Sequence, residues 1–337
     1  MKKKFNIVSK IKSTRTFRLI RLATKKISLP GFDDMPLYDV VVFFVRGLSD
    51  GAITTRASSV AYKFFIAMFP AIIFLFTLIP YLPIANFQNT LLETIRTALP
   101  VNVNAMINET ITDIIARQHG GLLSLGFILA LYFSSNGILG LITAFNATAH
   151  QIETRKWWQQ YAVSILLMII LTLIVILSIT MIMLGTSGLN YLISAHIIEE
   201  SVLLFIIRIS KWITIVLMIF FGVSFLYYLG PVKRKEFRFI SAGSTLATLL
   251  FIASTLGFKY YVDNFASYNA VYGSIGTVIV ILMWLYFNSL ALLMGFELNA
   301  SILEAKKTKS VVAVVSKKTK KKYAAAAKKA SKNIDKT

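Results

Sequence analysis

The sequence contains no cysteine and has few charged residues. Without cysteine, disulfides, thiolate metal sites and cysteine nucleophiles are all excluded. Charged residues make up 15% of the 337 positions and hydrophobic residues 56%, whereas soluble domains are about 25% charged. The three histidines, His119, His150 and His196, form no HxxxH or HExxH pair, so we expect no histidine metal site. The composition indicates a membrane protein.

Catalytic motifs are also missing. The chain has no GxSxG, P-loop or dinucleotide fingerprint, so we expect no cofactor. Asp50-Gly51 and Arg56-Ala57 faintly echo a motif of lipid-alcohol transferases, but the second aspartate pair that would hold catalytic metals is absent. A nuclease needs clustered carboxylates or His/Lys groups facing water, and here the acids are dispersed. We therefore do not expect an enzyme.

The net charge of +21 comes entirely from the two tails. Residues 1–30 hold ten Lys/Arg and no acid, and residues 306–337 hold twelve Lys/Arg and one acid. Tails of this kind favour retention in the cytoplasm and attraction to anionic lipid headgroups. They have no folded recognition pattern or interleaved aromatics, so no specific nucleic-acid partner is expected. The basic start lacks an apolar h-region, which argues against a cleaved signal, and it only faintly resembles an organellar presequence.

Long apolar runs predict six membrane spans. The first is residues 57–83, with no charge from Phe64 to Leu82, and such a run crosses a hydrocarbon layer of about 30 Å. We predict an all-α integral membrane protein, a six-transmembrane helical bundle with an N-terminal interfacial helix at 37–48 and a small extracytoplasmic helical cap. Its parts are a basic tail (1–30), a membrane domain (31–304) with spans at 57–83, 122–149, 157–184, 202–229, 239–258 and 271–300 and a cap at 84–120, and a basic low-complexity tail (305–337).

Two features refine this prediction. The second span carries small residues at three- and four-residue spacing, which predicts a central packing helix; these are Ala130, Ser134, Gly137, Gly140 and Ala144. Every second connection is basic, as are both tails, while the connections between them are neutral or acidic. This alternation predicts that both termini lie in the cytoplasm.

Several motifs resemble the YihY / virulence factor BrkB family of bacterial inner-membrane proteins, once labelled ribonuclease BN. The similarity covers roughly residues 40–304. It is carried by Ala61-Tyr62 and Phe69-Pro70, by the Tyr228-x-x-Pro231 turn, and by Tyr272-Gly273-Ser274, Trp284-Leu285-Tyr286 and Gly295-Phe296-Glu297-Leu298-Asn299-Ala300. Lys63 departs from the family pattern. The resemblance implies a six-span bundle in a bacterial inner membrane and no settled substrate.

Polar residues at membrane depth are the candidate ligand or cavity positions, because they are costly there. Arg208 and Lys211 lie on one helix face, and either snorkel to the surface or form a cationic patch suited to a phosphate headgroup. The fourth span includes both if it starts at Val202 and neither if it starts at Trp212. Lys63 and Glu297 are open to three interpretations: an ion pair between spans 1 and 6, snorkelling, or a coupling-ion site.

The remaining candidates are less specific. Asn288 either joins helices or binds ligand, and Tyr62 either belongs to an interfacial belt or lines a cavity. Three further positions are structural: Pro70, Gly273 and Gly295. The leading functional hypothesis is a transporter or flippase for an anionic amphiphile, in particular a lipid. The alternative is a non-catalytic scaffold that recruits partners through its basic tails, and the sequence identifies no protein partner.

Overall fold

A computed structural model describes residues 28, 31–33, 35–50, 52–78, 120–149, 152–194, 200–233, 236–264 and 266–334. The secondary structure within these residues is helical. The helices are α3 (Leu37–Asp50), α4 (Ile53–Leu78), α7 (Gly120–Thr148), α8 (Trp157–Ser194), α9 (Glu200–Leu229), α10 (Ala242–Asn264) and α11 (Ala266–Ile334). All but α3 contain a segment long and apolar enough to cross a membrane, which confirms the predicted all-α, six-span architecture. Most of the predicted cap, 84–120, lies outside the described residues.

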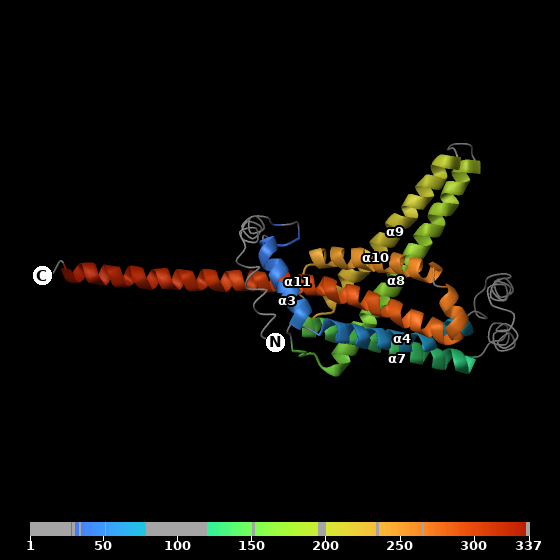
Figure 1. The fold of residues 1–337 in the computed structure, drawn as a ribbon, viewed down its shortest axis with the longest axis horizontal. Helices are drawn as coiled ribbons and strands as arrows, with labels where there is room; N and C mark the ends of the chain where they lie inside the picture. Colours follow the sequence, from blue (N-terminus) through green and yellow to red (C-terminus); the bar gives the residue numbers. More distant parts are fainter. Residues whose placement is uncertain are drawn as a thin grey trace.

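The interhelical connections at one end of the bundle carry basic residues. There α3, the α7–α8 connection and the α9–α10 connection lie close to the point where α11 leaves the bundle (Figure 1). The two connections carry Arg155, Lys156, Lys233 and Arg238. We call this the basic end.

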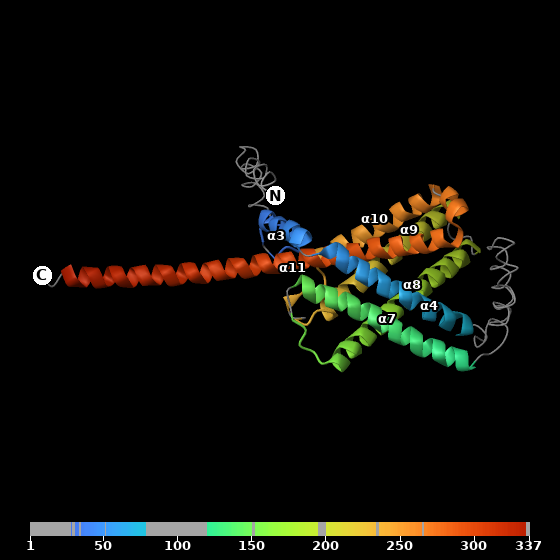
Figure 2. The same cartoon turned by 60° about the horizontal axis from the view of Figure 1, so that its bottom comes forward.

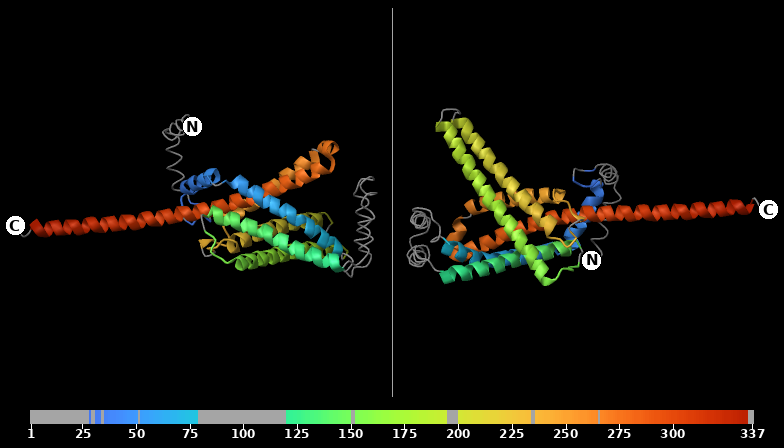
Figure 3. Two further views of the ribbon diagram at one scale, coloured as in Figure 1. Left: turned by 90° about the horizontal axis from the view of Figure 1, so that it is seen from below. Right: turned by 180° about the vertical axis from the view of Figure 1, so that it is seen from behind.

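Helix α7 lies at the centre of the packing, as its small residues predicted. Of its apolar segment, 44% is buried, against 11% for α8 and for α10. Its glycines allow α4 to approach closely, since a Cβ at Gly126 would contact the α4 backbone at Phe74, and one at Gly137 would press on the Phe64 ring. α4 and α7 accordingly run side by side (Figures 2 and 3). Small residues thus replace the hydrophobic effect as the means of helix association in lipid.

Aromatic rings join α7, α9 and α11 near the basic end. Phe145, Tyr227 and Phe296 are fully buried and pack ring against ring, with centroids 4.4–5.4 Å apart. The Tyr227 hydroxyl donates a hydrogen bond to the Leu292 carbonyl at 2.5 Å. These contacts fix α7, α9 and α11 against one another near the basic end.

Helix α3 crosses α11 outside the six spans (Figure 1). Val40 is buried against α11 in a cluster with Ile302 and Ala305, whereas Val41 and Val45 are 45% and 54% exposed. A short helix with one side on protein and valines on another is suited to the membrane interface.

Helices α8 and α9 form a hairpin that leans away from the other spans. Seen from behind, the hairpin runs diagonally across the bundle (Figure 3). The described side chains of α8, up to Ile182, are largely exposed, and Leu173 and Leu177 are 58% and 61% exposed. In a membrane such a surface faces lipid.

Helix α11 does not end at the membrane surface. It continues through the 69 residues of Ala266–Ile334 as one helix, and its second half extends far from the bundle (Figures 1 and 2). At 1.5 Å per residue its length is about 100 Å. No glycine or proline occurs after Gly295, so nothing in the local sequence stops the helix.

A hydrogen-bond network joins the two basic connections. Arg155 donates from Nε and Nη2 to the two carboxylate oxygens of Glu153 at 2.8 Å, and from Nη2 to the carbonyl of Gly230 at 3.1 Å. Asn146 donates to Glu153 at 2.8 Å and accepts from the Val232 amide at 3.1 Å. The Arg155 guanidinium holds the pKa of Glu153 below its usual value. The network fixes the α7–α8 connection against the α9–α10 connection.

Candidate functional site

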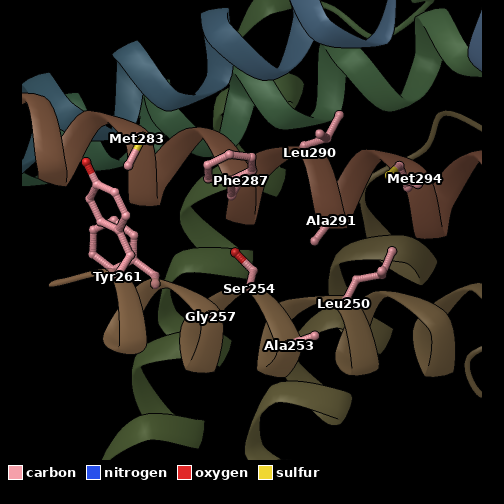
Figure 4. Close-up of a pocket in the computed structure, with 11 residues that line it drawn as sticks. Leu250, Ala253, Ser254, Gly257, Tyr261, Met283, Phe287, Leu290, Ala291 and Met294 are labelled. Atoms are coloured by element: carbon pink, nitrogen blue, oxygen red, sulfur yellow. The ribbon is translucent and has the colours of Figure 1, made fainter. Parts of the chain in front are cut away.

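An apolar cavity of about 540 Å³ lies between α10 and α11 (Figure 4). It is lined by Leu250, Ala253, Ser254, Gly257, Phe258 and Tyr261 of α10 and by Met283, Phe287, Leu290, Ala291 and Met294 of α11. Along α10 it extends for about 16 Å at the helical rise, roughly half of a 30 Å hydrocarbon layer. Its volume is in the range of ordinary ligand sites, about 300–1,000 Å³.

The shape of the cavity follows from a glycine contact at the basic end. A Cβ on Gly243 of α10 would overlap the Gly295 carbonyl of α11, and a Cβ on Gly295 would lie 2.5 Å from that of Ala247. The backbones therefore touch here. Beyond this contact several of the facing residues are small, among them Ala253, Gly257 and Ala291, and they do not fill the space between the helices. The space left between them is the cavity.

Asn299 of α11 stabilises the same contact between α10 and α11 through hydrogen bonds. Its Oδ1 accepts a hydrogen bond from the Gly243 amide at 2.8 Å, and its Nδ2 donates to Ser241 Oγ at 2.9 Å. The Gly243 amide belongs to the first turn of α10, where backbone donors have no partner within the helix. Asn299 thus caps α10 from a neighbouring span.

Polar groups in and beside the cavity are few. Ser254 points from α10 toward α11 in Figure 4, and its buried hydroxyl has no hydrogen-bond partner among the described residues. Asn288, which follows the lining residue Phe287, is 5% exposed, and neither atom of its amide finds a partner within the described chain. A buried polar group without a partner costs free energy. Ser254, which lines the cavity, is therefore a natural polar contact for a ligand.

Gly257 leaves the wall of the cavity open. A Cβ built there meets no atom within 4 Å. A larger side chain at this position would occupy the cavity without displacing protein atoms. Gly121, near the start of α7, has the same open surroundings and does not line the cavity.

A second, polar pocket lies at the basic end, between α3, α4, α7 and α11. Its volume is about 470 Å³, and it is lined by Phe43, Arg46, Gly47, Ala52, Thr55, Arg56, Ala147, Thr148, Glu297 and Glu304. A smaller cavity of about 280 Å³ adjoins it and shares Thr148, Glu297 and Glu304 with it. We call the larger of the two the basic-end pocket.

Arg56 and Glu297 face each other in this pocket. Arg56 donates from Nη1 to the Ala144 carbonyl at 3.2 Å and, by a short bond, to the Thr148 hydroxyl. Glu297 is 6% exposed and interacts electrostatically with the Arg56 guanidinium. Its carboxylate occupies the space above Gly47, where any Cβ would overlap Oε1. The glycine on α3 therefore makes room for the acid on α11.

The structure brings only some of the predicted positions together. Glu297 lies in the basic-end pocket, but its cationic neighbour on α4 is Arg56 rather than Lys63. Lys63 is seven residues, or about 10 Å, further along α4, and its side chain lies across Gly140 of α7. The electrostatic contact between spans 1 and 6 is therefore made by Arg56 and Glu297.

The other predicted positions lie apart from both cavities or at structural contacts. Lys211 is exposed on α9 and Tyr62 is 62% exposed on α4, and neither lines a cavity in the described part of the chain. The side chain of Arg208 and the surroundings of Gly273 are outside the described residues. Pro70 is buried within α4 and does not end it. Gly295 makes the α10–α11 contact described above.

Sequence reasoning missed four residues that build these sites, namely Arg46, Arg56, Gly243 and Ser254. The two arginines flank apolar runs and read as interfacial anchors. Gly243 and Ser254 lie in a span already rich in small polar residues. A search for glycines on neighbouring spans would have singled out Gly243 with Gly295.

The fold and these sites define a multi-pass α-helical membrane protein. Comparison with known families identifies it further: the model of the family described as Virulence factor BrkB matches residues 44–319. The chain therefore belongs to that family, as its motifs indicated.

The ribonuclease-like protein YfkH of Bacillus subtilis (strain 168) is 29% identical over 75% of this chain and 91% of its own length. The UPF0761 membrane protein NTHI0384 of Haemophilus influenzae (strain 86-028NP) is 20% identical over 77% of this chain and 94% of its own length. The UPF0761 membrane protein of Vibrio atlanticus (strain LGP32) is 36% identical over 26% of this chain and 28% of its own length. No solved structure matches the chain.

Proposed function

We propose that the protein is a transporter or flippase for an anionic amphiphile, in particular a lipid, in the bacterial cytoplasmic membrane. The observation that carries this proposal is the apolar cavity between α10 and α11. The cavity is open on one side, where Gly257 and Phe287 are exposed, so a lipid chain can enter it from the surrounding bilayer. An acyl chain is a suitable occupant, since the lining is almost entirely hydrocarbon and sulfur and the only hydroxyls are those of Ser254 and Tyr261.

The orientation belongs to the same proposal. We place the basic end in the cytoplasm, because lysine and arginine are retained on that side of bacterial membranes. Lipid would then contact the basic-end pocket from the cytoplasmic leaflet and the apolar cavity within the membrane. With no nucleotide-binding motif in the sequence, uphill transport would draw on an ion gradient or on a separate ATPase.

The experiment measures lipid flipping in liposomes that contain the purified full-length protein. A headgroup-labelled anionic lipid and an impermeant quencher report the rate at which lipid changes leaflet. Gly257→Leu fills the cavity, and Gly121→Leu is its matched control, because both glycines have open surroundings. We expect wild type and Gly121→Leu to flip lipid at equal rates and Gly257→Leu to fall to the protein-free rate. Flipping by Gly257→Leu at the wild-type rate would refute the cavity as the lipid path.

A scaffold is the second candidate function, and one observation favours it. α11 carries its basic second half away from the bundle as a continuous helix, a form suited to reaching partners in the cytoplasm. Truncation after Ser310 separates the two functions. A transporter so shortened retains lipid flipping in liposomes, whereas a scaffold loses its cellular role.

A further inference from the structure

The basic-end pocket is a separate site from the apolar cavity and has the opposite chemistry. Arg46 comes from α3, Arg56 from α4, and Glu297 and Glu304 from α11. Four charged side chains from three helices thus line one space of about 470 Å³. Charges are not gathered in this way at a membrane surface without a cost in desolvation. The arrangement is therefore a candidate ligand site.

The cationic side of the pocket suits a phosphate group. Arginine recognises phosphate through paired N–H donors, and the Arg56 guanidinium is held in place by Ala144 and Thr148 of α7. The Thr55 hydroxyl lines the same space. Thr55 also belongs to the first turn of α4, whose free N–H groups favour an anion.

Glu297 occupies the position that an anion would take. Its buried carboxylate faces Arg56 and has room there only because residue 47 is glycine. Arg56 is half-buried, so an anion beside its guanidinium stabilises the charge. Arg46 and Arg56 give the pocket two positive charges, which Glu297 and Glu304 already balance, so a bound phosphate adds a third anion. Protonation of Glu297 removes this conflict.

We propose that the basic-end pocket binds the phosphate group of an anionic ligand, and that Glu297 gates this binding by taking up a proton from the cytoplasm. In the empty site the Glu297 carboxylate neutralises Arg56. When phosphate enters, Glu297 becomes a neutral acid and Arg56 pairs with the phosphate. One proton is therefore bound with each phosphate group.

The groups that face Glu297 support this exchange. They are Arg46 of α3, Arg56 of α4, and Glu304 and Lys307 of α11, while α7 contributes the uncharged Thr148. Lys307 is engaged by Glu236 at 2.9 Å. Glu304 lies seven residues after Glu297 on the same helix and lines the same pocket, so a bound anion adds to the negative charge that α11 presents there.

This inference rests on the proposed function for the nature of the ligand, because it adds a headgroup site and a coupling proton to a lipid carrier. A phosphate diester is also found in free molecules, so the pocket's chemistry does not by itself require a lipid. The test therefore compares a lipid with its free headgroup.

The test measures binding to the purified full-length protein in detergent by calorimetry at about pH 5.5 and about pH 8. The probes are phosphatidylglycerol and free glycerophosphoglycerol. Both are diesters, so they lack the second phosphate ionisation near pH 6 that would mimic a titrating protein group. For wild type we expect affinity to rise toward low pH, by up to tenfold per pH unit where one proton is linked to binding.

Single-residue variants test which side chains produce the pH dependence of binding. Glu297→Gln should bind as tightly as the wild type does at low pH, and with equal affinity at both pH values. Arg56→Gln should lose binding at both. Arg56 also holds α4 against α7 through its hydrogen bonds, so its loss could weaken binding indirectly. Arg46→Gln on α3 keeps those hydrogen bonds and should also weaken binding at both pH values. Lys309→Gln removes an exposed cation that lies twelve residues after Glu297 on α11, and this variant should behave as wild type.

Binding of both probes supports a diester site, and binding of phosphatidylglycerol alone supports a site for the lipid headgroup. Failure of both probes to bind, or an unchanged pH dependence in Glu297→Gln, overturns the inference. Lipid flipping without such binding would leave the proposed function intact. Proton-linked binding without flipping would instead refute the proposed function and leave the phosphate site in place.

Discussion

Replacing Gly295 by alanine should destabilise the bundle, whereas replacing Gly257 should not. Both glycines lie at the α10–α11 pair, but their surroundings differ. A Cβ at Gly295 would lie 2.5 Å from the Ala247 Cβ, 2.5 Å from the Gly243 carbonyl oxygen and 2.6 Å from the Tyr227 hydroxyl. A Cβ at Gly257 meets nothing within 4 Å.

The magnitude follows from two opposing terms. Adding a methyl group to a packed core costs about 1–3 kcal/mol. Alanine regains about 1 kcal/mol of helix propensity over glycine at either position. Gly257→Ala should therefore be neutral or stabilising by up to about 1 kcal/mol. The propensity term cancels between the two variants, so Gly295→Ala should be less stable than Gly257→Ala by about 1–3 kcal/mol.

Equilibrium unfolding of the two purified variants in mixed micelles measures this difference. The Gly295 variant should also lose near-UV signal from the buried rings, because the new methyl displaces Tyr227 from Phe145 and Phe296. Equal stability of the two variants would show that α10 and α11 are not in backbone contact at Gly243 and Gly295. The cavity would then lose its structural explanation.

Two further predictions concern the basic end. Asn299→Ala removes the acceptor of the Gly243 amide and should lower the free energy of unfolding by about 1–3 kcal/mol; Asn299→Asp, which keeps the acceptor oxygen, should restore part of it in the same unfolding assay. Arg155 lowers the pKa of Glu153, so Glu153 contributes stability above its unfolded pKa of about 4.3 and loses that contribution as the pH falls through the folded value. Melting curves from about pH 7 to about pH 3 should show this loss in wild type and a smaller loss in Glu153→Gln, and equal slopes would contradict the argument.

The basic second half of α11 differs from what the sequence composition indicates. The change from apolar to lysine-rich sequence near residue 305 predicts a boundary between the membrane domain and the tail. Secondary structure follows other signals, because a helix ends at glycine, proline or a cap. None of these occurs near residue 305, so α11 continues to Ile334.

The sequence by itself determined the six membrane-spanning helices of the described residues. In lipid every backbone polar group must be satisfied within its own segment, so a long apolar run has to be a helix whatever its neighbours are. The central position of α7 was also readable, because Gly137 and Gly140 mark a face that admits another backbone. These are local properties, and local sequence carries them.

Only the tertiary structure decided which residues meet. The pairing of Glu297 with Arg56 instead of Lys63 depends on how α4 is shifted along α11, and the cavity depends on where α10 and α11 touch at Gly243 and Gly295. A shift of two helical turns leaves every span's composition unchanged but exchanges its partners. Helix register is set by packing summed over the whole interface, which no single segment encodes.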